Sequence, residues 1–313
     1  MSFKLAGKVA IITGSSRSIG AAIARRLAED GANVIINYVG NLQAANQVAG
    51  AINSKGVGKA VVVKADVSSA AGAKQLLDET IKAFGRLDIL VLNAGIMGSK
   101  ILADVDEQFF DSHIQINVKG PLFLTKAAAP LLPSGGRIIF FSSSLTKASG
   151  VLPNALVYLA SKGAIEQIAR VLAKDLGARG ITVNTISPGP VDTPLFREGK
   201  TEQQIQFIAG LNPSKRIGTP DEIAPAVAFL ASPEATWVNG QNILVNGKYK
   251  SEIITILTGV TLAAWLKNDR AYIDYAYFVP NMLGVFLVTL LPWNDKVGLL
   301  FGIWATAARL PLS

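Results

Sequence analysis

Short apolar runs alternate with longer segments of helical periodicity from residue 8 to residue 250. The run KVAIIT at 8–13 is continuous and rich in β-branched residues, which is typical of a strand buried on both faces. Comparable runs follow at 33–38, 60–66, 87–93, 136–143, 181–187 and 241–247. A helix is expected at 19–30 between the first two runs, and similar segments separate the others. The pattern predicts an α/β fold with a doubly wound parallel sheet of seven strands and helices on both faces.

The longest irregular stretch, at 188–220, contains five prolines and four glycines. A short helix is expected within it, near 201–210. Long loops inside compact domains are usually lids or binding loops. We therefore expect residues 1–249 to form one ligand-binding domain, with a substrate lid at 188–220.

A second segment, at 250–313, has three uncharged stretches at 253–266, 275–294 and 297–308. The middle stretch has the length of a bilayer-crossing helix, although Pro280 and Asn281 shorten its useful part. The sequence NMLGVFLVTLLPWNDKVGLLFGIWATAA resembles part of a fungal major-facilitator-type transporter. We expect an apolar helical extension with three alternative origins. It is a fused reading frame without a catalytic role, a membrane anchor through 253–308, or a cover for the first domain or a partner subunit.

The composition narrows the chemistry. The net charge is +8, but the basic residues are scattered, so a nucleic-acid partner is not expected. The absence of cysteine excludes disulfides, thiolate catalysis and cysteine metal sites. His113 is the single histidine, which argues against a histidine triad or a multi-histidine metal site. We expect no metal, and a packing or surface role for His113.

The first strand ends in the small-residue turn TGSSRSIG at 13–20, which leads into a helix. Such a turn suits a pyrophosphate, because backbone N–H groups and the helix dipole both favour negative charge. Gly14 allows the tight turn and Gly20 allows close packing of the helix. The turn resembles the TGxxxGxG motif of the short-chain dehydrogenase/reductase family, with Ser18 in place of the middle glycine. The resemblance implies a Rossmann-type fold and cofactor contacts from Gly14, Ser16, Arg17, Ser18, Ile19 and Gly20.

The end of the second strand, VIINYVGN, indicates which cofactor is used. NAD-binding enzymes carry an acidic residue there, which bonds the ribose 2′-hydroxyl. Here Asn37 and Tyr38 occupy the place, and no carboxylate repels a 2′-phosphate. Arg17 could reach that phosphate with a charge-assisted bond. The sequence therefore favours NADP(H) over NAD(H), with Asn37 and Tyr38 as further contacts.

The segment YLASK places Tyr158 and Lys162 four residues apart, on one face of a helix. A tyrosine ionises near pH 10, and a nearby ammonium lowers that pKa. The pair can therefore serve as an acid–base catalyst without histidine. The family's catalytic serine precedes the tyrosine by about 13 or 14 residues, which favours Ser144, with Ser143 as the alternative.

Other residues match the family over about 5–249. Asn93, in the NAG segment, matches a position against the cofactor, and Asp66 matches the adenine contact. Asn117 matches the asparagine that holds a water near the lysine in a proton relay. Val191 and Thr193 lie in PGPVDTP, which in the family folds over the nicotinamide.

The resemblance implies reversible hydride transfer between NADP(H) and a carbonyl or alcohol. Tyr158 would protonate the oxygen, Lys162 would lower the phenol pKa, and Ser144 would polarise the carbonyl, with Asn117 resupplying protons. The apolar lid suits an apolar or aromatic ketone, and the chain is similar to fungal reductases of polyketide-like or acyl ketones. The alternatives are alcohol oxidation in vivo, a non-catalytic NADP(H) sensor and a membrane-tethered reductase.

We expect a cytoplasmic protein, with membrane association through the tail as the alternative. The segment 155–178 has apolar positions on more than one face, which suits packing between subunits. The family resemblance implies a homo-oligomer, either a dimer or a tetramer, and this segment would suit its interface.

Overall fold

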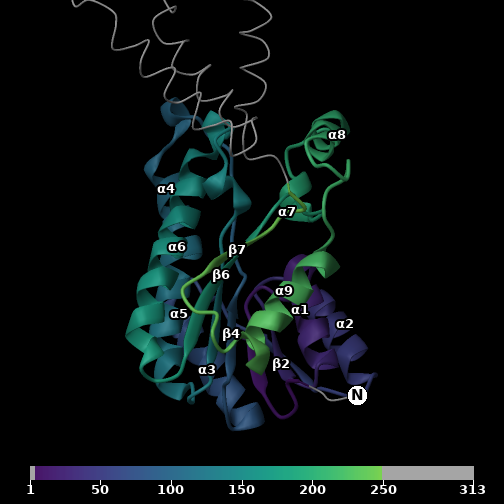
Figure 1. Ribbon diagram of the computed structural model, residues 1–313, viewed down its shortest axis with the longest axis vertical. Coiled ribbons are helices and arrows are strands. Elements are labelled where there is room, and N and C mark those ends of the chain that lie inside the picture. The colour runs from purple at the N-terminus through teal and green to yellow at the C-terminus, as the bar shows by residue number, and fades with distance from the viewer. Residues whose placement is uncertain (1–3, 249–313) are drawn as a thin grey trace, which may run out of the picture. The chain divides into compact units, whose positions relative to one another are not determined.

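The computed structural model describes residues 4–248, and the predicted apolar tail lies outside the described residues (Figure 1). The described part contains a seven-stranded sheet with the order β3-β2-β1-β4-β5-β6-β7. All six strand pairs are parallel, which confirms the predicted doubly wound sheet. The strands are β1 (Val9–Ile12), β2 (Asn33–Tyr38), β3 (Ala60–Lys64), β4 (Ile89–Leu92), β5 (Arg137–Phe141), β6 (Thr182–Pro188) and β7 (Asn242–Val245).

Helices cover both faces of the sheet, and two apolar cores result. One face packs against α1 (Ser18–Glu29), α2 (Leu42–Asn53) and α9 (Pro220–Ala231). The other packs against α3 (Ala70–Phe84), α5 (Gly120–Ala128) and α6 (Leu156–Gly177). Alternate residues of one strand serve opposite cores: Ile12 belongs to the first and Ile11 to the second. This double burial explains why the central strands are apolar without alternation.

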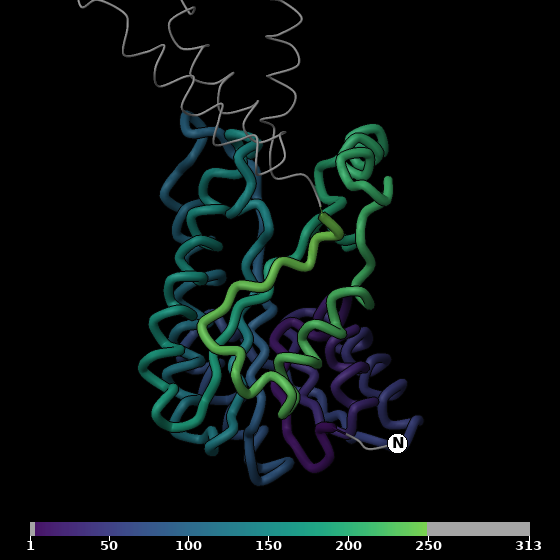
Figure 2. Tube along the Cα trace, viewed as in Figure 1, coloured from purple at the N-terminus to yellow at the C-terminus, as the bar shows by residue number. Residues whose placement is uncertain are grey.

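Two helices from opposite ends of the described sequence, α1 and α9, pack against each other. Figure 2 shows the green segment of α9 beside the purple segment of α1, and these two helices make extensive contact. On the sheet, β1 lies between β2 and β4, so successive crossovers run in opposite directions from it. Ligands of such sheets bind beyond the carboxyl ends of the strands at this point of reversal. The turn after β1 and the segment after β4 both begin there.

One irregularity lies between α4 (Glu107–Ile114) and α5. Residues Gln115–Lys119 form a π-helical turn, which carries Asn117. Such turns are rare, and they are found frequently at functional sites. The sequence pattern did not predict this one. The 3₁₀ turns are Leu102–Asp104, Ala129–Leu131, Ser144–Lys147, Pro153–Ala155 and Pro233–Ala235.

The predicted lid contains two helices, α7 (Pro194–Arg197) and α8 (Glu202–Gly210). The expected helix near 201–210 is confirmed as α8. It begins with a capping box, in which Thr201 and Gln204 bond each other's backbone N–H groups. Within residues 4–248, no helix combines the length and the hydropathy that crossing a bilayer needs.

Candidate active site

The turn after β1 is shaped by two glycines that cannot carry a side chain. Gly14 has φ +63°, and a Cβ there would lie 3.2 Å from the Cα of Ala94. A Cβ on Gly20 would lie 2.5 Å from the carbonyl oxygen of Gly14. No side chain caps the start of α1, where Arg17 is the N-cap residue. Its first N–H groups are therefore available to an anion, and the turn fits the pyrophosphate of a dinucleotide.

Ser18 is strained at the position where the family motif has glycine. Its φ is +51°, in the left-handed region that residues with a Cβ rarely adopt. It is the first residue of α1, so the strain lies at the entrance of the anion site. The turn therefore keeps the backbone that glycine would allow, at a cost in conformational energy.

The Asn37 side chain holds the glycine turn in place by hydrogen bonds. Its side chain is 1% exposed. Its Oδ1 accepts the N–H of Gly14 at 3.1 Å, and its Nδ2 donates to the carbonyl oxygen of Ala65 at 2.9 Å. Its backbone N–H donates to Ser15 Oγ at 3.0 Å. The Asn37 amide thus joins the turn to the end of β3, an internal role that the prediction of a cofactor contact did not include.

Tyr38, also predicted as a cofactor contact, lies at the end of β2. Its ring is 9% exposed and belongs to the core between the sheet and α1. The sequence could place Tyr38 at the strand end, but not the direction of its ring. Ile19 is half-buried against the same core.

A cavity of about 370 Å³ adjoins the start of α1. Three predicted cofactor residues, Ser16, Arg17 and Ser18, contribute to its wall. Arg25 and Asp221 also line it, and they form an ion pair at 3.6 Å that the sequence did not predict. The exposed Arg17 can therefore meet an anion on this side of the turn.

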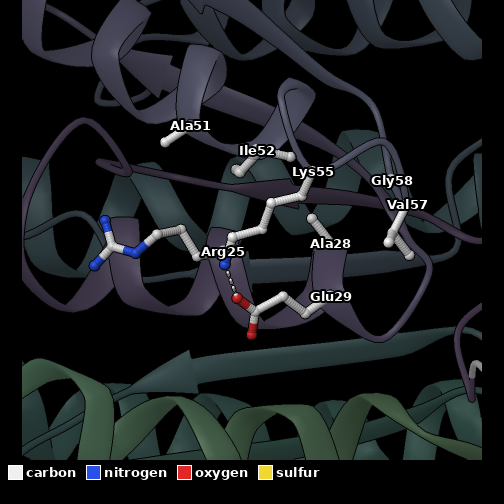
Figure 3. Close-up of a pocket in the computed structure, with 8 residues that line it drawn as sticks. All are labelled: Arg25, Ala28, Glu29, Ala51, Ile52, Lys55, Val57 and Gly58. Carbon is white, nitrogen blue, oxygen red and sulfur yellow. Dashed lines mark hydrogen bonds and ion pairs between the residues drawn. The ribbon is translucent and has the colours of Figure 1, made fainter.

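Figure 3 shows a smaller cavity between α1 and α2, where Lys55 pairs with Glu29 at 2.6 Å. None of the predicted site residues lines it. It is therefore separate from the cofactor turn.

The segment after β4 closes against the same turn. Asn93 Nδ2 donates to the carbonyl oxygen of Thr13 at 2.9 Å, and the N–H of Ala94 donates to Thr13 Oγ1 at 2.9 Å. Asp66 lies exposed after β3, where its Oδ1 accepts bonds from the N–H and hydroxyl of Ser68. Asn93 thus fixes the turn, while the Asp66 carboxylate lies at the surface of the site.

The predicted catalytic pair lies near the start of α6. Lys162 is 6% exposed, and its Nζ donates to the carbonyl oxygen of Phe141 at 2.9 Å. The same Nζ lies 5.8 Å from the ring centroid of Tyr158. Burial lowers the pKa of Lys162 to about 8. The lysine therefore joins α6 to the end of β5.

The pKa of Tyr158 departs from the expectation. Burial raises it above its usual value near 10, and a hydrogen bond from Ser143 opposes that rise without cancelling it. The expected lowering by the Lys162 ammonium is not among the causes of this shift, and Lys162 Nζ donates its hydrogen bond to the Phe141 carbonyl. In this ligand-free structure Tyr158 is a protonated acid at neutral pH.

Three serines follow β5, and they differ in their contacts. Ser143 is the one whose side chain bonds Tyr158, and it also accepts the N–H of Leu145 at 3.3 Å. Ser144, favoured by the spacing, is 3% exposed and begins the next 3₁₀ turn. Ser142 Oγ lies 2.8 Å from Glu166 Oε1. In this ligand-free structure Ser143, the alternative to Ser144, is the serine that acts on the pKa of Tyr158, and the choice of Ser144 as the catalytic serine stays a prediction.

Asn117 lies in the π-helical turn and is 1% exposed. Its amide bonds both the N–H and the carbonyl of Ile96, each at 2.9 Å, and its Nδ2 donates to Ser161 Oγ at 3.0 Å. A Cβ on Gly95 would lie 3.0 Å from Asn117 Oδ1 and 3.4 Å from Lys162 Nζ. Asn117 and Lys162 thus approach the same point of the chain after β4.

The remaining predicted residues lie in the lid segment. Val191 is 5% exposed and pairs with Gly218. Thr193 is 8% exposed, and its Oγ1 caps α7 by accepting the N–H of Phe196 at 3.1 Å. Both residues thus organise the start of the segment that is predicted to be a lid.

His113 is 2% exposed, bonds the Phe109 carbonyl and packs against the Phe109 ring, with the ring centroids 4.3 Å apart and the planes tilted by 46°. The packing role expected for this histidine is therefore confirmed. Within residues 4–248 no group of three or more potential ligands is arranged to hold a metal ion.

Comparison with known proteins places this geometry in a family. Residues 14–249 match the family described as enoyl-(acyl carrier protein) reductase. A short-chain type dehydrogenase/reductase of Picea abies is 44% identical, over 78% of this chain and 92% of its own. A probable tetrahydroxynaphthalene reductase of Zymoseptoria tritici is 40% identical, over 78% and 95%.

Solved structures agree with these relatives. A short-chain dehydrogenase of Burkholderia cenocepacia in complex with NADP has a TM-score of 0.73 and 37% identity, over 78% of this chain and 98% of its own. A landomycin C-6 ketoreductase with bound NADP and rabelomycin has a TM-score of 0.70 and 37% identity, over 78% and 96%. The chain is an oxidoreductase that belongs to the short-chain dehydrogenase/reductase family.

Proposed function

We propose that the protein reduces a ketone to a secondary alcohol with NADPH. The observation that carries this proposal is the half-buried Tyr158, with Ser143 beside it, one helical turn before the buried Lys162. Hydride transfer to a carbonyl carbon needs an acid at the carbonyl oxygen. A phenol whose pKa burial has raised is such an acid at neutral pH. The same residues can serve alcohol oxidation only when the phenol has lost its proton.

The choice of NADP(H) rests on charge at the cofactor turn. The uncapped start of α1 and the crowded Gly14 and Gly20 fit a pyrophosphate. Arg17 is exposed beside a cavity, and β2 ends without a carboxylate. Solved relatives hold NADP in this fold. When bound, the cofactor supplies the hydride.

The chain's own residues then have separate tasks. Tyr158 gives its hydroxyl proton to the carbonyl oxygen. Lys162 holds the end of β5 through Phe141, and with its pKa near 8 it is mainly protonated at pH 7. The Asn117 amide is held by Ile96 and Ser161 beside Lys162, and a water bonded by Asn117 would resupply protons past the lysine. Ser143 and Ser144 both lie where a hydroxyl can orient the substrate.

The substrate proposed is a bulky apolar or aromatic ketone. Apolar side chains stand exposed on the segments before α6 and in the lid, with Leu152 at 70%, Phe207 at 69% and Leu195 at 40%. Exposed apolar side chains in a binding loop gain free energy by covering an apolar ligand. The tetrahydroxynaphthalene reductase and the ketoreductase with rabelomycin among the relatives support a polycyclic, polyketide-derived ketone.

The test is the Tyr158→Phe variant, assayed by NADPH oxidation with a panel of aromatic ketones. Removal of the acid should abolish nearly all turnover, while NADPH binding, followed by nucleotide fluorescence, stays within about twofold. Retention of most of the turnover would refute the assignment. NADPH binding by the wild type without turnover of any ketone would instead support a sensor.

The tail at 250–313 is proposed to take no part in catalysis. The match of this chain to the family ends at residue 249, and the alignment with the relative from Picea abies covers 78% of the chain. Mass determination of the native C-terminus and membrane fractionation test this. A full-length chain confined to membranes would favour the tethered reductase.

We also propose a homo-oligomer, because Phe123 on α5 and Val171 on α6 are 46% and 57% exposed. Light scattering of the purified protein measures its mass.

A further inference from the structure

A buried carboxylate lies one turn beyond the catalytic lysine. Glu166 follows Tyr158 and Lys162 at a spacing of four residues on α6, so the three residues share one helix face. Its side chain is 7% exposed. A carboxylate taken out of water costs several kcal/mol unless charges and hydrogen bonds compensate it. The surroundings of Glu166 must therefore provide specific partners.

These partners all come from the segment 142–147 that follows β5. Ser142 Oγ lies 2.8 Å from Glu166 Oε1, and the Thr146 hydroxyl donates to the same oxygen. Lys147 Nζ lies 2.6 Å from Oε2. Burial alone would raise the pKa of Glu166, but the bonds from Lys147, Thr146 and Ser142 hold it below its usual value. Glu166 is thus an anion with three donors around it.

The donors lie on both sides of the candidate catalytic serines. Ser142 precedes Ser143, while Thr146 and Lys147 follow Ser144. Thr146 Oγ1 also lies 2.8 Å from the carbonyl oxygen of Ser143, and Ser142 Oγ lies 3.1 Å from that of Lys162. A hydroxyl has one proton, and a charged acceptor makes the stronger bond. Without Glu166, both hydroxyls would turn to these backbone carbonyls.

The bonds of Glu166 join the segment 142–147 to α6, and these two elements carry the residues that act together in the proposed reaction. The serine segment carries Ser143, whose side chain bonds Tyr158, and α6 carries Tyr158 itself. We propose that Glu166 is a positioning residue, which holds the segment 142–147 against α6 so that the serine hydroxyl meets Tyr158. This inference rests on the proposed ketone reduction. It adds a residue that contacts neither the phenol nor the turn that holds the cofactor.

The test compares Glu166→Ala with Glu166→Gln in the full chain, using kcat, KM and NADPH affinity. A misplacement of about 1 Å can lower turnover about 100-fold. We expect Glu166→Ala to lower kcat about 10- to 100-fold, with NADPH affinity within about twofold. Glu166→Gln keeps an acceptor for the Ser142 and Thr146 hydroxyls, so it should retain kcat within about fivefold. Rescue by this amide would show that the bonds to the segment matter.

A pH profile separates positioning from a purely structural role. The hydrogen bond from Ser143 lowers the pKa of Tyr158, so its loss in Glu166→Ala raises that pKa further. Ketone reduction needs the protonated phenol, and its alkaline limit should move to higher pH. Alcohol oxidation needs the phenolate, and its acidic limb should also move to higher pH. A variant that is only less stable would melt earlier with an unchanged profile.

The matched control is Glu29→Ala. Glu29 also pairs with a lysine at 2.6 Å, but it is 45% exposed and lies beside the cavity of Figure 3. This variant should leave kcat and the pH profile unchanged. If Glu166→Ala does not fold, Thr146→Val removes one donor and should show the same pH displacement at a smaller loss of kcat. A folded Glu166→Ala or Thr146→Val variant with wild-type kcat and profile would overturn the inference. Failure of the wild type to reduce any ketone would instead overturn the proposed function.

Discussion

Asn37 provides the sharpest test of how the cofactor turn is built. The change is Asn37→Ala, which removes an amide that is 1% exposed. It leaves the N–H of Gly14 and the carbonyl of Ala65 without the partners found at 3.1 and 2.9 Å. A buried polar group that loses its partner costs about 1 to 3 kcal/mol.

The two groups together should lower the free energy of unfolding by about 2 to 4 kcal/mol, because water can reach part of the turn and offset some of the loss. For a domain of this size, that corresponds to a fall in Tm of about 5 to 15 °C. The N–H of Gly14 would also no longer be held in place. The affinity for NADPH should therefore fall about tenfold, although the Asn37 amide itself is bonded inside the protein.

The assays are urea unfolding followed by circular dichroism and NADPH binding followed by fluorescence. Asn33→Ala is the control, because Asn33 lies on the same strand and its Oδ1 accepts the N–H of Lys59 at 3.0 Å in an exposed position. The control should lose less than about 1 kcal/mol and keep its NADPH affinity. A similar loss of stability in both variants, or unchanged NADPH affinity in Asn37→Ala, would refute the role given to this side chain.

Four further variants test the rest of the site. Ser18→Gly relieves the strain of a φ of +51° and should raise the free energy of unfolding by about 0.5 to 1 kcal/mol. Urea unfolding measures this change, and a loss of stability would show that Ser18 is not strained. Arg17→Ala should weaken NADPH binding about 10- to 100-fold and leave NADH binding nearly unchanged, and equal effects on both would remove Arg17 from the 2′-phosphate. Ser143→Ala and Ser144→Ala identify by kcat which hydroxyl orients the carbonyl. Ser143→Ala alone should move the pH dependence of turnover upward, since Ser143 lowers the pKa of Tyr158.

The fold could be predicted because strands that are buried on both faces of a sheet are continuously apolar in sequence. The run predicted at 33–38 coincides with β2, and the helix predicted at 19–30 coincides with α1 within one residue at each end. The approach of Tyr158 to Lys162 was also predictable, because helical spacing alone places them together.

Side-chain direction at strand ends was less predictable. Asn37 and Tyr38 were placed at the end of β2, but the amide bonds backbone groups and the ring packs into the core. The same difficulty separates Ser143 from Ser144, since the backbone changes there from extended to a 3₁₀ turn, which spacing along the sequence does not reveal. Glu166 was overlooked because a glutamate on a helix is usually a solvated charge, and only the folded segment 142–147 reveals its partners.

The π-helical turn at Gln115–Lys119 makes this helix sensitive to the insertion or deletion of a residue. A bond from residue i to i+5 accommodates one residue more than an α-helical turn does. Deletion of a single residue there would convert the π-helical turn into an α-helical one, so that α4 continues into α5 and the side chains of the turn itself point in new directions. Asn117 would then lose its alignment with Ile96 and Ser161, although every other residue of the site remained. Insertions and deletions in this helix are therefore a class of change to which the enzyme should be more sensitive than to most substitutions.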